Sequence, residues 1–593
     1  MTQPRSPRLC EFGDRRVKRQ RARELRRIRL VGVVLLAATA WYVPWMLHAM
    51  RPGLGWIAFP FVAANFVVLC AALVSLVNNW KRAVPPERLV ARGTEPLVAV
   101  VVPTCAEPVG MVERTVRSVL VQDWPENRLV VIVSDDANNV AVAEMVDRLQ
   151  SAFPRTTVRY HRPPPRESAQ RRGDAKDGNL NAALALLDSQ HPDVAWIETR
   201  DADDELGDPR FLRHCIGQME AEPRVAFVQT IKDARVAEGD PFDNRALYFY
   251  RGTMLARQAA NAVFPCGSGV VWRRFALNDI GGFPTWNLVE DVQSGVEALR
   301  RGWRGVYLPI VGALAQSAPE DLPNVYKQRG TWALDSMRLM LWAELRGLTL
   351  RQRLQFLEIQ LQYMQGMAVV VFMFLPVFSF LFGLSPLRAT PLSYATHLLP
   401  FIVALECYYW VYQSGGDSFR RYVRARELTA GLSPLFLKAA VLAVLAGPHH
   451  KPAYRVTRKV PQFALYGREI VVQLAMVMLV VLAIGYRVMA GGLYDVGSLY
   501  WAMFWIALII GFIPRAWFGV DLGSTLSNRV GSSVSDLRHT GTFLRLRHLD
   551  FAAAELHAAE LIERLDRDAL ASAAAGSRTR HLPTARVTGV DHH

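Results

Sequence analysis

The chain has 593 residues, of which 51% are hydrophobic, and its mean hydropathy of +0.11 favours a membrane protein over a purely soluble one. The net charge of +16 does not indicate a nucleic-acid partner, because the basic residues lie beside apolar segments, as they do at a membrane surface. Six cysteines occur singly and form no CxxC pair, which excludes a disulfide framework and a cysteine zinc site and favours a reducing, cytosolic compartment.

The N-terminal region combines a basic arm with two apolar segments. Residues 1–29 hold eleven Lys and Arg against three acidic residues, which predicts a cytosolic arm. Segments at about 30–49 and 56–79 are each long enough to span a bilayer. The link between them carries one basic residue, Arg51, so we expect it outside and expect the chain to return to the cytosol.

The region that follows alternates between apolar runs and helical patterns, which predicts a mostly parallel α/β sheet. Runs at 97–102 and 129–133 are expected strands, with a helix at 112–121 between them. Ligands of such sheets bind beyond the carboxyl ends of the strands. Three polar motifs fall at such ends, namely 103–108, Asp135-Asp136 and Asp201-Ala202-Asp203. Together they indicate a nucleotide-diphosphate pocket.

The motif Asp201-Ala202-Asp203 is the candidate metal site. An apolar run at 194–197 predicts a buried strand just before it. Carboxylates two residues apart at a strand end can aim at one Mg²⁺ or Mn²⁺, whose other ligands would be substrate phosphates. A solvated acidic turn is the alternative interpretation.

Three further motifs supply a cation, a flexible turn and a pair of acids. Lys176 precedes a helix expected at 182–187 and can neutralise a phosphate, unless this is an ordinary capped helix start. The turn at 264–269 is rich in glycine, so backbone can approach a substrate, although it can also be a plain turn. Glu290 and Asp291 precede a helix expected at 292–299 and either cap it or include a general base.

Trp332 lies in the segment Gln328-Arg329-Gly330-Thr331-Trp332, shortly before the next apolar region. A tryptophan can stack on the apolar face of a sugar ring. Anchoring at the membrane interface is the alternative, because membrane helices follow closely.

The remainder of the chain is again apolar. Basic residues number ten in 414–468 against one, Arg388, in the loops 386–392 and 490–497, which predicts six spans with both termini inside. Residues 345–362 and 432–445 are expected to be amphipathic helices lying on the membrane. The expected spans in this part are 366–385, 393–413, 469–489 and 498–517.

Glu406 is a charge inside one of these expected spans. An intramembrane carboxylate is costly and usually faces a cavity. We therefore expect it to border a polar path, with neighbouring aromatic residues contacting sugar. Pairing with another helix, for instance with a Tyr hydroxyl, is the alternative.

These motifs, in this order, resemble those of the membrane-embedded processive family 2 glycosyltransferases, and most closely the catalytic subunit of bacterial cellulose synthase, over about residues 30–517. The resemblance implies a polytopic α-helical membrane protein of the inner (plasma) membrane with an inserted cytosolic α/β GT-A domain. The implied parts are a basic arm (1–29), two transmembrane helices (30–80), the GT-A domain (90–345), interfacial helices with a gating loop and about four transmembrane helices (346–517), and a cytosolic tail (518–593).

The resemblance also implies a donor site for a UDP-sugar. Thr104 and Glu107 correspond to residues that contact uracil, and Lys176 to one that contacts a phosphate. The DxD motif at Asp201 and Asp203 corresponds to the site for UDP and Mg²⁺ or Mn²⁺. The implied donor residues are Thr104, Glu107, Asp135, Asp136, Lys176, Asp201, Asp203, Gln328 and Arg329.

Other motifs imply catalytic, acceptor and gating roles. The family's TED motif corresponds to Val289-Glu290-Asp291 and implies that Asp291 is the general base, with Glu290 beside it. The implied acceptor and product residues are Cys266, Gly267, Ser268 and Trp332. The FxVTxK motif implies a gating loop that includes Tyr454, Val456, Thr457 and Lys459.

Two departures from the family pattern stand out. The family's QxxRW motif carries Thr331 in place of an arginine that contacts the diphosphate. Arg329 or an arginine of the gating loop are the candidates to replace it. A PilZ domain is not expected, because the tail is short and residues 536–541 only loosely match its DxSxxG motif. Regulation by cyclic-di-GMP is therefore not expected.

The expected function is an inverting processive glycosyltransferase that polymerises glucose from UDP-glucose into a β-glucan and exports it through its own channel. Its expected partners are the UDP-sugar, the growing polysaccharide and the lipid bilayer, with room for accessory export subunits and no nucleic acid. A non-processive transferase that glycosylates a membrane lipid is one alternative. A transport or scaffold protein with a decayed transferase domain is the other. The linkage, the exact sugar and the oligomeric state stay open.

Overall fold

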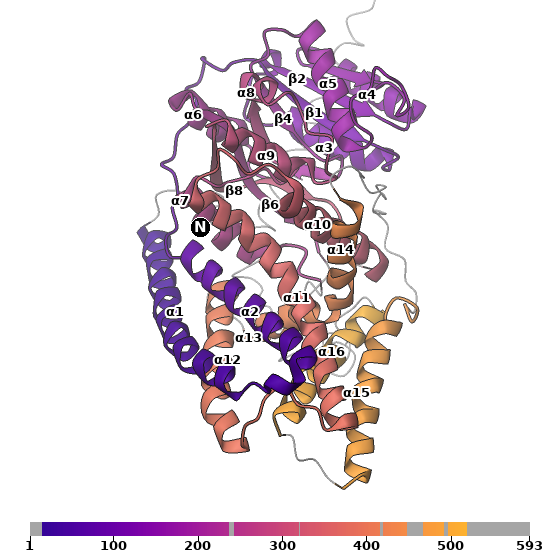
Figure 1. Ribbon diagram of the computed structural model, residues 1–593. Coiled ribbons are helices and arrows are strands. Elements are labelled where there is room, and N and C mark those ends of the chain that lie inside the picture. Colours follow the sequence, from indigo (N-terminus) through magenta and orange to yellow (C-terminus); the bar gives the residue numbers. More distant parts are fainter. Residues whose placement is uncertain are drawn as a thin grey trace, which may run out of the picture. The chain divides into compact units, whose positions relative to one another are not determined.

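A computed structural model describes residues 15–236, 242–319, 321–414, 419–447, 466–491 and 496–518, all within one unit, Cys10–Val530. An α/β domain is inserted between two groups of long apolar helices (Figure 1), which confirms the predicted fold class. The gating-loop residues Tyr454, Val456, Thr457 and Lys459 lie outside the described residues, as does the expected tail from residue 519 onward.

One eight-stranded sheet organises the α/β domain, and its strands run in the order β3-β2-β1-β4-β7-β6-β8-β5. The strands are β1 (Val98–Thr104), β2 (Leu129–Asp135), β3 (Thr157–His161), β4 (Trp196–Thr199), β5 (Asp204–Leu206), β6 (Val225–Ala234), β7 (Val270–Arg273) and β8 (Arg304–Ala315). Strands β3, β2, β1 and β4 pair in parallel, and β6 pairs in parallel with β8. Strand β7 is antiparallel to both of its neighbours, and β5 is antiparallel to β8.

The expectation of a mostly parallel sheet is therefore correct for the first four strands and wrong for the other half, which is mixed. The physical reason is that a strand buried on both faces shows the same continuous apolar run whichever way it points. Strand β7 is an example, because Val270, Val271 and Trp272 are all buried.

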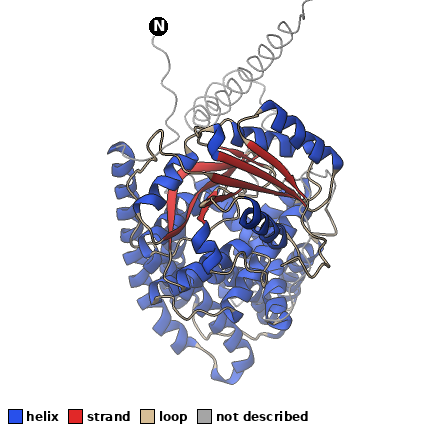
Figure 2. Ribbon diagram, turned by 90° about the horizontal axis from the view of Figure 1, so that it is seen from above, coloured by secondary structure: helices blue, strands red, loops and turns tan. Residues whose placement is uncertain are grey.

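Valine-rich strands and amphipathic helices build the core of the α/β domain. Val98, Val100 and Val102 of β1 are fully buried, and full burial of such a side chain contributes roughly 1.5 kcal/mol or more. Helices pack on both sides of the sheet (Figure 2). The helices of this domain that bear on the site are α3 (Val109–Leu120), α4 (Val140–Ala152), α5 (Lys176–Gln190), α6 (Phe211–Ala221), α9 (Glu290–Arg300) and α10 (Leu322–Trp342).

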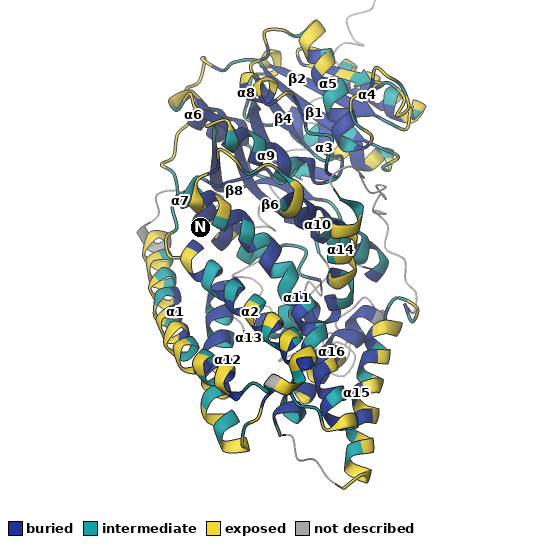
Figure 3. Cartoon of the chain, in the orientation of Figure 1, coloured by how far each residue is buried: buried dark blue, intermediate teal, exposed yellow. Residues whose placement is uncertain are grey.

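Five helices among the described residues are long and apolar enough to cross a membrane. They are Lys18–Ala49 within α1 (Arg15–Ala49), α2 (Gly55–Asn78), α11 (Leu350–Phe382), α15 (Val471–Met489), and Gly497–Ala516 within α16 (Val496–Phe518). The pair α13 (Phe419–Gly431) and α14 (Ser433–Ala446), bent by 50°, adds a sixth if it is counted as one span. Phe59, Phe66 and Met489 are exposed on these helices. Exposed residues recur along α1, α2 and α15 (Figure 3). Lipid can cover such side chains, so the chain is a membrane protein.

The helices after the α/β domain differ from the expectation in two respects. The interfacial helix expected at 345–362 and the span expected at 366–385 form one continuous helix, α11, which starts with a capping box between Thr349 and Gln352. The change from an amphipathic to an apolar pattern therefore does not break the helix. Helix α12 (Pro391–Ser414) covers the span expected at 393–413. It is not among the five, because residues 406–413 are rich in polar and aromatic side chains.

Buried polar contacts join the α/β domain to the apolar helices. Glu358 of α11 accepts hydrogen bonds from Asn78 Nδ2 of α2 at 2.8 Å and from Tyr412 OH of α12 at 3.3 Å. The Tyr412 hydroxyl also lies 2.8 Å from Thr253 Oγ1, in the short π-helix Phe249–Thr253 that leads to the glycine-rich turn at 264–269. These bonds anchor that segment of the domain against three of the long helices.

Candidate active site

The carboxyl ends of three parallel strands bring the polar motifs to one edge of the sheet. Thr104 of β1 pairs in register with Asp135 of β2, and Val101 pairs with Thr199 of β4. The segments that leave these strands therefore start side by side. Asp201 lies two residues beyond the end of β4. The edge that the sequence predicts as a pocket does gather these residues, and their individual roles stay predictions.

Thr104 and Glu107 form one end of this edge. Thr104 Oγ1 donates a hydrogen bond to Glu107 Oε2 at 2.7 Å, and the backbone N–H of Cys105 donates to the same oxygen at 2.5 Å. Ala106 has a φ of 66°, in the left-handed region that a non-glycine residue rarely adopts. This turn folds Glu107 back onto Thr104, so the two side chains are held together before any ligand arrives.

Asp135 and Asp136 are both engaged with neighbouring protein groups. Asp135 accepts hydrogen bonds from the backbone N–H of Ala137 at 2.9 Å and of Asn139 at 2.7 Å, which shape the turn after β2. Asp136 binds both terminal nitrogens of Arg171, at 2.8 and 2.9 Å. The charge of Asp136 is thus neutralised by a buried arginine from the irregular segment between β3 and α5. Both carboxylates lie beside Thr104, since Asp136 N also donates to its carbonyl at 3.0 Å.

Asp201 stands at the centre of the edge, between two lysines. Lys176 Nζ, at the first residue of α5, lies 2.5 Å from Asp201 Oδ1, and Lys232 Nζ, on β6, lies 2.5 Å from Asp201 Oδ2. Burial disfavours the charged carboxylate, but the two ammonium groups outweigh it and hold the pKa of Asp201 well below its usual range. Burial likewise disfavours charged Lys176, but Asp201 and Glu290 raise its pKa above the ordinary value. All three groups are therefore charged at neutral pH.

Two further carboxylates follow Asp201 in the chain. Asp204 is fully buried at the start of β5, and its Oδ2 lies 2.9 Å from Lys232 Nζ. Burial raises the pKa of Asp204. Asp203 is 6% exposed, and its carbonyl accepts a hydrogen bond from Gln316 N at 2.8 Å. Lys232 thus faces a cluster of three acidic residues from one segment, while only Asp201 shares a second lysine.

Glu290 and Asp291 begin α9 and converge on the same place. Lys176 Nζ lies 3.6 Å from Glu290 Oε1. A methyl group on Gly267, whose φ is +80°, would lie 3.2 Å from both Asp291 Oδ2 and Lys176 Nζ, so these atoms meet at the glycine-rich turn. Burial raises the pKa of Asp291, and burial together with the charge of Asp291 raises the pKa of Glu290 to about 7. An aspartate with a raised pKa next to an ammonium group is suited to accepting a proton.

A buried glutamine of β6 holds the turn at 264–269 through hydrogen bonds to the backbone of the turn. Gln229 Oε1 accepts from the backbone N–H of Cys266 at 2.7 Å, and Gln229 Nε2 donates to the carbonyl of Ser268 at 3.0 Å. Ser268 Oγ in turn accepts from the backbone N–H of Asp201 at 3.1 Å. The implied acceptor residues Cys266, Gly267 and Ser268 are therefore linked directly to the acidic segment.

The implied site residues on α10 differ in their exposure and in their contacts. Trp332 is 38% exposed, and Gln328 is half-buried. The Arg329 guanidinium lies over the Trp332 ring, 5.1 Å from its centre, and donates to the carbonyls of Phe242 at 3.1 Å and Asp243 at 3.0 Å. Thr331 donates to Lys327 O of its own helix at 2.8 Å. Arg329 is thus held by a loop and not by the acidic centre, so the structure does not bring it to the other implied donor residues.

Sequence reasoning missed Lys232 and Gln229. Both lie in the second half of β6, where the polar-rich stretch Gln229-Thr230-Ile231-Lys232-Asp233 follows the apolar start of the strand and neither residue stands out. The one available signal was the cost of burying a lysine, which predicts a carboxylate partner without identifying it.

The donor set fits a divalent cation only together with a substrate. Among the described residues, no group of three or more His, Cys, Asp or Glu side chains is arranged to hold a metal ion by itself. Asp201 and Asp203 offer hard oxygen ligands of the kind that Mg²⁺ and Mn²⁺ prefer, and phosphates would complete the coordination. Two lysines at this place, Lys176 and Lys232, face five acidic residues, so acidic groups are in excess. The five are Asp201, Asp203, Asp204, Glu290 and Asp291.

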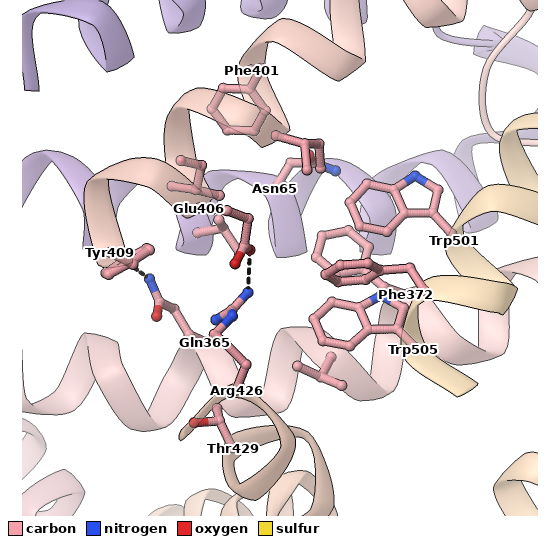
Figure 4. Close-up of a pocket in the computed structure, with 15 residues that line it drawn as sticks. Asn65, Gln365, Phe372, Phe401, Glu406, Tyr409, Arg426, Thr429, Trp501 and Trp505 are labelled. Carbon is pink, nitrogen blue, oxygen red and sulfur yellow. Dashed lines mark hydrogen bonds and ion pairs between the residues drawn. The ribbon is translucent and has the colours of Figure 1, made fainter. Parts of the chain in front are cut away.

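A second polar place lies among the long helices (Figure 4). Glu406 of α12 pairs with Arg426 of α13 at 2.7 Å and also accepts a hydrogen bond from the Tyr422 hydroxyl. The rings of Phe372, Trp501 and Trp505 stack nearly parallel on the other side of this pocket. The interhelical pairing that was the alternative interpretation of Glu406 is thus present, and the same side chain also lines a cavity, as the first interpretation expected. Its part in a polar path for sugar stays a prediction.

Comparison with known protein families gives one match. The model for the family described as "Glycosyltransferase like family 2" matches residues 96–334. This range covers all eight strands of the sheet and the motifs from Thr104 to Trp332.

Similar proteins carry cellulose synthase names. "Putative cellulose synthase 2" of Komagataeibacter xylinus is 28% identical over 448 residues, which cover 70% of this chain and 27% of that protein. "Cellulose synthase catalytic subunit [UDP-forming]" of Pseudomonas fluorescens (strain SBW25) is 27% identical over 390 residues, which cover 63% of this chain and 50% of that protein. The matches thus span half or less of the length of these relatives.

A solved structure also matches in part. The mannosyltransferase PcManGT from Pyrobaculum calidifontis, in complex with GDP-Man and Mn²⁺, is 18% identical with a TM-score of 0.47. The alignment covers 65% of this chain and 99% of that one.

Proposed function

Because the chain is a cellulose-synthase-like family 2 glycosyltransferase, we propose that it transfers glucose from UDP-glucose to the end of a growing β-glucan. The observation that carries this proposal is the convergence of Asp201, Lys176 and Asp291 at Gly267, on the strand edge that also holds Thr104 and Glu107. That arrangement supports a diphosphate site beside Asp291, a half-buried carboxylate that would act as the base.

In this proposal the nucleotide lies along the strand edge. Thr104 and Glu107 contact the uracil, and Lys176 contacts the diphosphate. Asp201 and Asp203 hold Mg²⁺ or Mn²⁺, which neutralises the diphosphate when bound and makes UDP a better leaving group. Asp135 and Asp136 act mainly through the backbone and Arg171, since their carboxylates are already bonded. Gln328 completes the donor side from α10, whereas Arg329 positions Trp332.

Asp291 is the proposed general base. It takes the proton from the acceptor hydroxyl while that oxygen attacks the anomeric carbon, and the bond from this carbon to the UDP oxygen breaks. In-line attack inverts the configuration and gives a β-linkage. Glu290 lies between Asp291 and Lys176, where its protonation state tunes the local charge. Trp332 and the turn at Cys266, Gly267 and Ser268 hold the acceptor sugar by stacking and by close backbone approach.

Export through the chain's own helices is the second part of the proposal. The pocket near Glu406 combines stacked aromatic rings with polar side chains, a combination that suits sugar rings. The indole nitrogens of Trp501 and Trp505 are buried and have no hydrogen-bond partner among the described residues. Buried hydrogen-bond donors without a partner in an apolar region favour the binding of a polar group, such as a hydroxyl of a glycan.

The proposal also includes the side of the membrane on which each part of the chain lies. The α/β domain at 90–345 lies on the cytosolic side of the plasma membrane, where UDP-sugars are made, and the spans at 30–80 and 346–517 surround the export path. Accessory export subunits would meet the polymer on the far side.

The deciding experiment uses purified protein in lipid with Mg²⁺ or Mn²⁺ and labelled UDP-glucose. The product is sized and digested with linkage-specific glucanases. A long, digestible polymer is the expected result and names the linkage. One sugar on a lipid would favour the non-processive transferase, and Thr331→Arg would then test whether the missing arginine limits processivity. No UDP release at all would favour a transport or scaffold protein.

A further inference from the structure

Lys232 is a cation in the acidic centre that none of the motifs above explains. It comes from β6, in the mixed half of the sheet, whereas Lys176 comes from α5. The two ammonium groups contact the same carboxylate, and each lies 2.5 Å from one oxygen of Asp201. Their side chains are 26% and 28% exposed, so both remain within reach of a ligand.

The helix α10 does not supply positive charge to this place. Thr331 is uncharged and bonds to its own helix. Arg329 is fixed by the carbonyls of Phe242 and Asp243 and by stacking on Trp332. A diphosphate carries at least two negative charges and needs more than one cationic side chain or a metal to balance it. Among the described residues at the acidic centre, Lys176 and Lys232 are the cations that contact Asp201.

We propose that Lys232 is a second diphosphate-binding residue, which supplies from β6 the positive charge that Thr331 cannot supply from α10. This inference rests on the proposed function. Without donor, both lysines neutralise Asp201. If a divalent cation took Asp201, Lys232 would keep Asp204 and Lys176 would keep Glu290, but each ammonium group would lose one anionic partner and could bind another anion. The diphosphate of the donor would be that anion.

The competing explanation is purely structural: Lys232 would only balance Asp201 and Asp204. The two explanations differ in what they predict for ligands with different numbers of phosphates. A diphosphate ligand senses the loss of a phosphate contact, whereas uridine does not. A structural defect in the segment from Asp201 to Asp204 would not discriminate in this way.

The test measures binding of UDP and of uridine by calorimetry to the full chain in detergent or lipid, with Mg²⁺ and with chelator. For Lys232→Gln we expect the affinity for UDP to fall on the order of tenfold to a hundredfold, as for one charge-assisted hydrogen bond, with uridine affinity changed by less than about twofold. Lys232→Arg should recover most of the loss. Equal UDP affinity in wild type and Lys232→Gln, or equal losses for UDP and uridine, would overturn the proposal.

Two further variants separate charge balance from ligand contact. Arg235→Gln removes the same charge three residues along the chain, where Arg235 pairs with Glu205 at 2.7 Å, and should leave UDP affinity unchanged. The double variant Lys232→Gln/Asp204→Asn removes both members of a buried ion pair. If Lys232 were only structural, the double variant would regain UDP affinity, which contradicts the proposal. If Lys232 binds phosphate, the loss persists.

The wild-type protein distinguishes this inference from the proposed function. If wild type neither binds UDP nor releases it from UDP-glucose, the proposed function fails and Lys232 fails with it. If wild type makes polymer and Lys232→Gln binds UDP as tightly as wild type, only the role of Lys232 is refuted.

Discussion

The two charged places in this molecule are built on opposite principles. At the strand edge, five carboxylates face two lysines, and the lysine side chains are about a quarter exposed. Among the long helices, Glu406 faces one arginine and one tyrosine hydroxyl, and Glu406 and Arg426 are 23% and 18% exposed. The first place has unbalanced charge, and the second is balanced one to one.

We propose that this difference separates a binding centre, at the strand edge, from a passage for the polymer, near Glu406. An excess of acidic groups in a partly buried place is costly unless a cation joins it, so the strand edge is set up for a metal and its anionic ligand. A balanced pair needs no ligand and would repel neither a neutral sugar nor water. The balanced pocket therefore suits a neutral polymer, whereas the unbalanced edge suits a charged donor.

Removal of the proposed general base from the strand edge should lower the rate of sugar transfer and leave the affinity for UDP unchanged. For Asp291→Asn we expect transfer to fall by about 10²- to 10⁴-fold, as for loss of a general base, because the amide cannot accept the proton. UDP affinity should stay near that of wild type, since the role proposed for Asp291 is toward the acceptor hydroxyl and not toward the nucleotide. The measurement pairs the rate of UDP release with UDP calorimetry, and equal loss of both would refute the assigned role.

The balanced pair should respond to single and double substitution in opposite ways. Glu406→Gln leaves Arg426 without its charged partner among apolar helices, which costs about 3–5 kcal/mol. We expect a lower melting temperature for this variant and recovery in Glu406→Gln/Arg426→Gln. If the pocket also guides polymer, the recovered double variant still shortens or slows the product while its first sugar transfers proceed normally. Wild-type polymer from the double variant, or from Glu406→Leu, would leave the pair with a structural role only.

The pH dependence of donor binding should reveal Glu290. Burial and Asp291 raise the pKa of Glu290 to about 7, so Glu290 is protonated below that pH and ionises as the pH rises through it. The new negative charge lies beside Lys176 and opposes the diphosphate. We therefore expect UDP affinity to weaken several-fold above about pH 7 in wild type and to lose this step in Glu290→Gln. An identical pH profile in the two proteins would contradict the assignment.

The smallest expected effect concerns Arg329. The arginine is bonded to the carbonyls of Phe242 and Asp243 and lies over Trp332, away from the acidic centre. For Arg329→Gln we expect UDP affinity within about twofold of wild type, because the residue lies outside the charge cluster. A tenfold loss of UDP affinity would show instead that Arg329 replaces the arginine missing at Thr331. Lys232→Gln, measured alongside, provides the comparison.

Much of the fold and of the strand edge follows from local sequence signals. Apolar runs end at Thr104, Asp135 and just before Asp201, and parallel pairing of their strands brings these ends together. The segment from Glu290 to Asp291 starts a helix as expected, although α9 begins at Glu290 itself and not at residue 292. Lys176 is likewise the first residue of α5, six residues before the expected start of the helix at residue 182.

What sequence reasoning could not supply is the set of contacts between distant segments. Lys232 reaches Asp201 because β4 and β6 both pair with β7, which brings the segment after β4 close to β6. Strand β7 is antiparallel to both neighbours, and its sequence does not reveal that direction. Arg171 neutralises Asp136 because an irregular loop folds over the strand ends. Arg329 points away from the acidic centre because a neighbouring loop offers two carbonyls, which no helical pattern encodes.

The central claim is that the strand edge, with its unbalanced charge, binds a nucleotide diphosphate together with a divalent cation. The most direct test is calorimetry of UDP with wild type and Asp201→Asn, each with Mg²⁺ and with chelator. The account predicts one UDP per chain for wild type, weakened by chelation, and loss of that metal dependence in Asp201→Asn. No UDP binding by wild type, or the same metal dependence in both proteins, would contradict it.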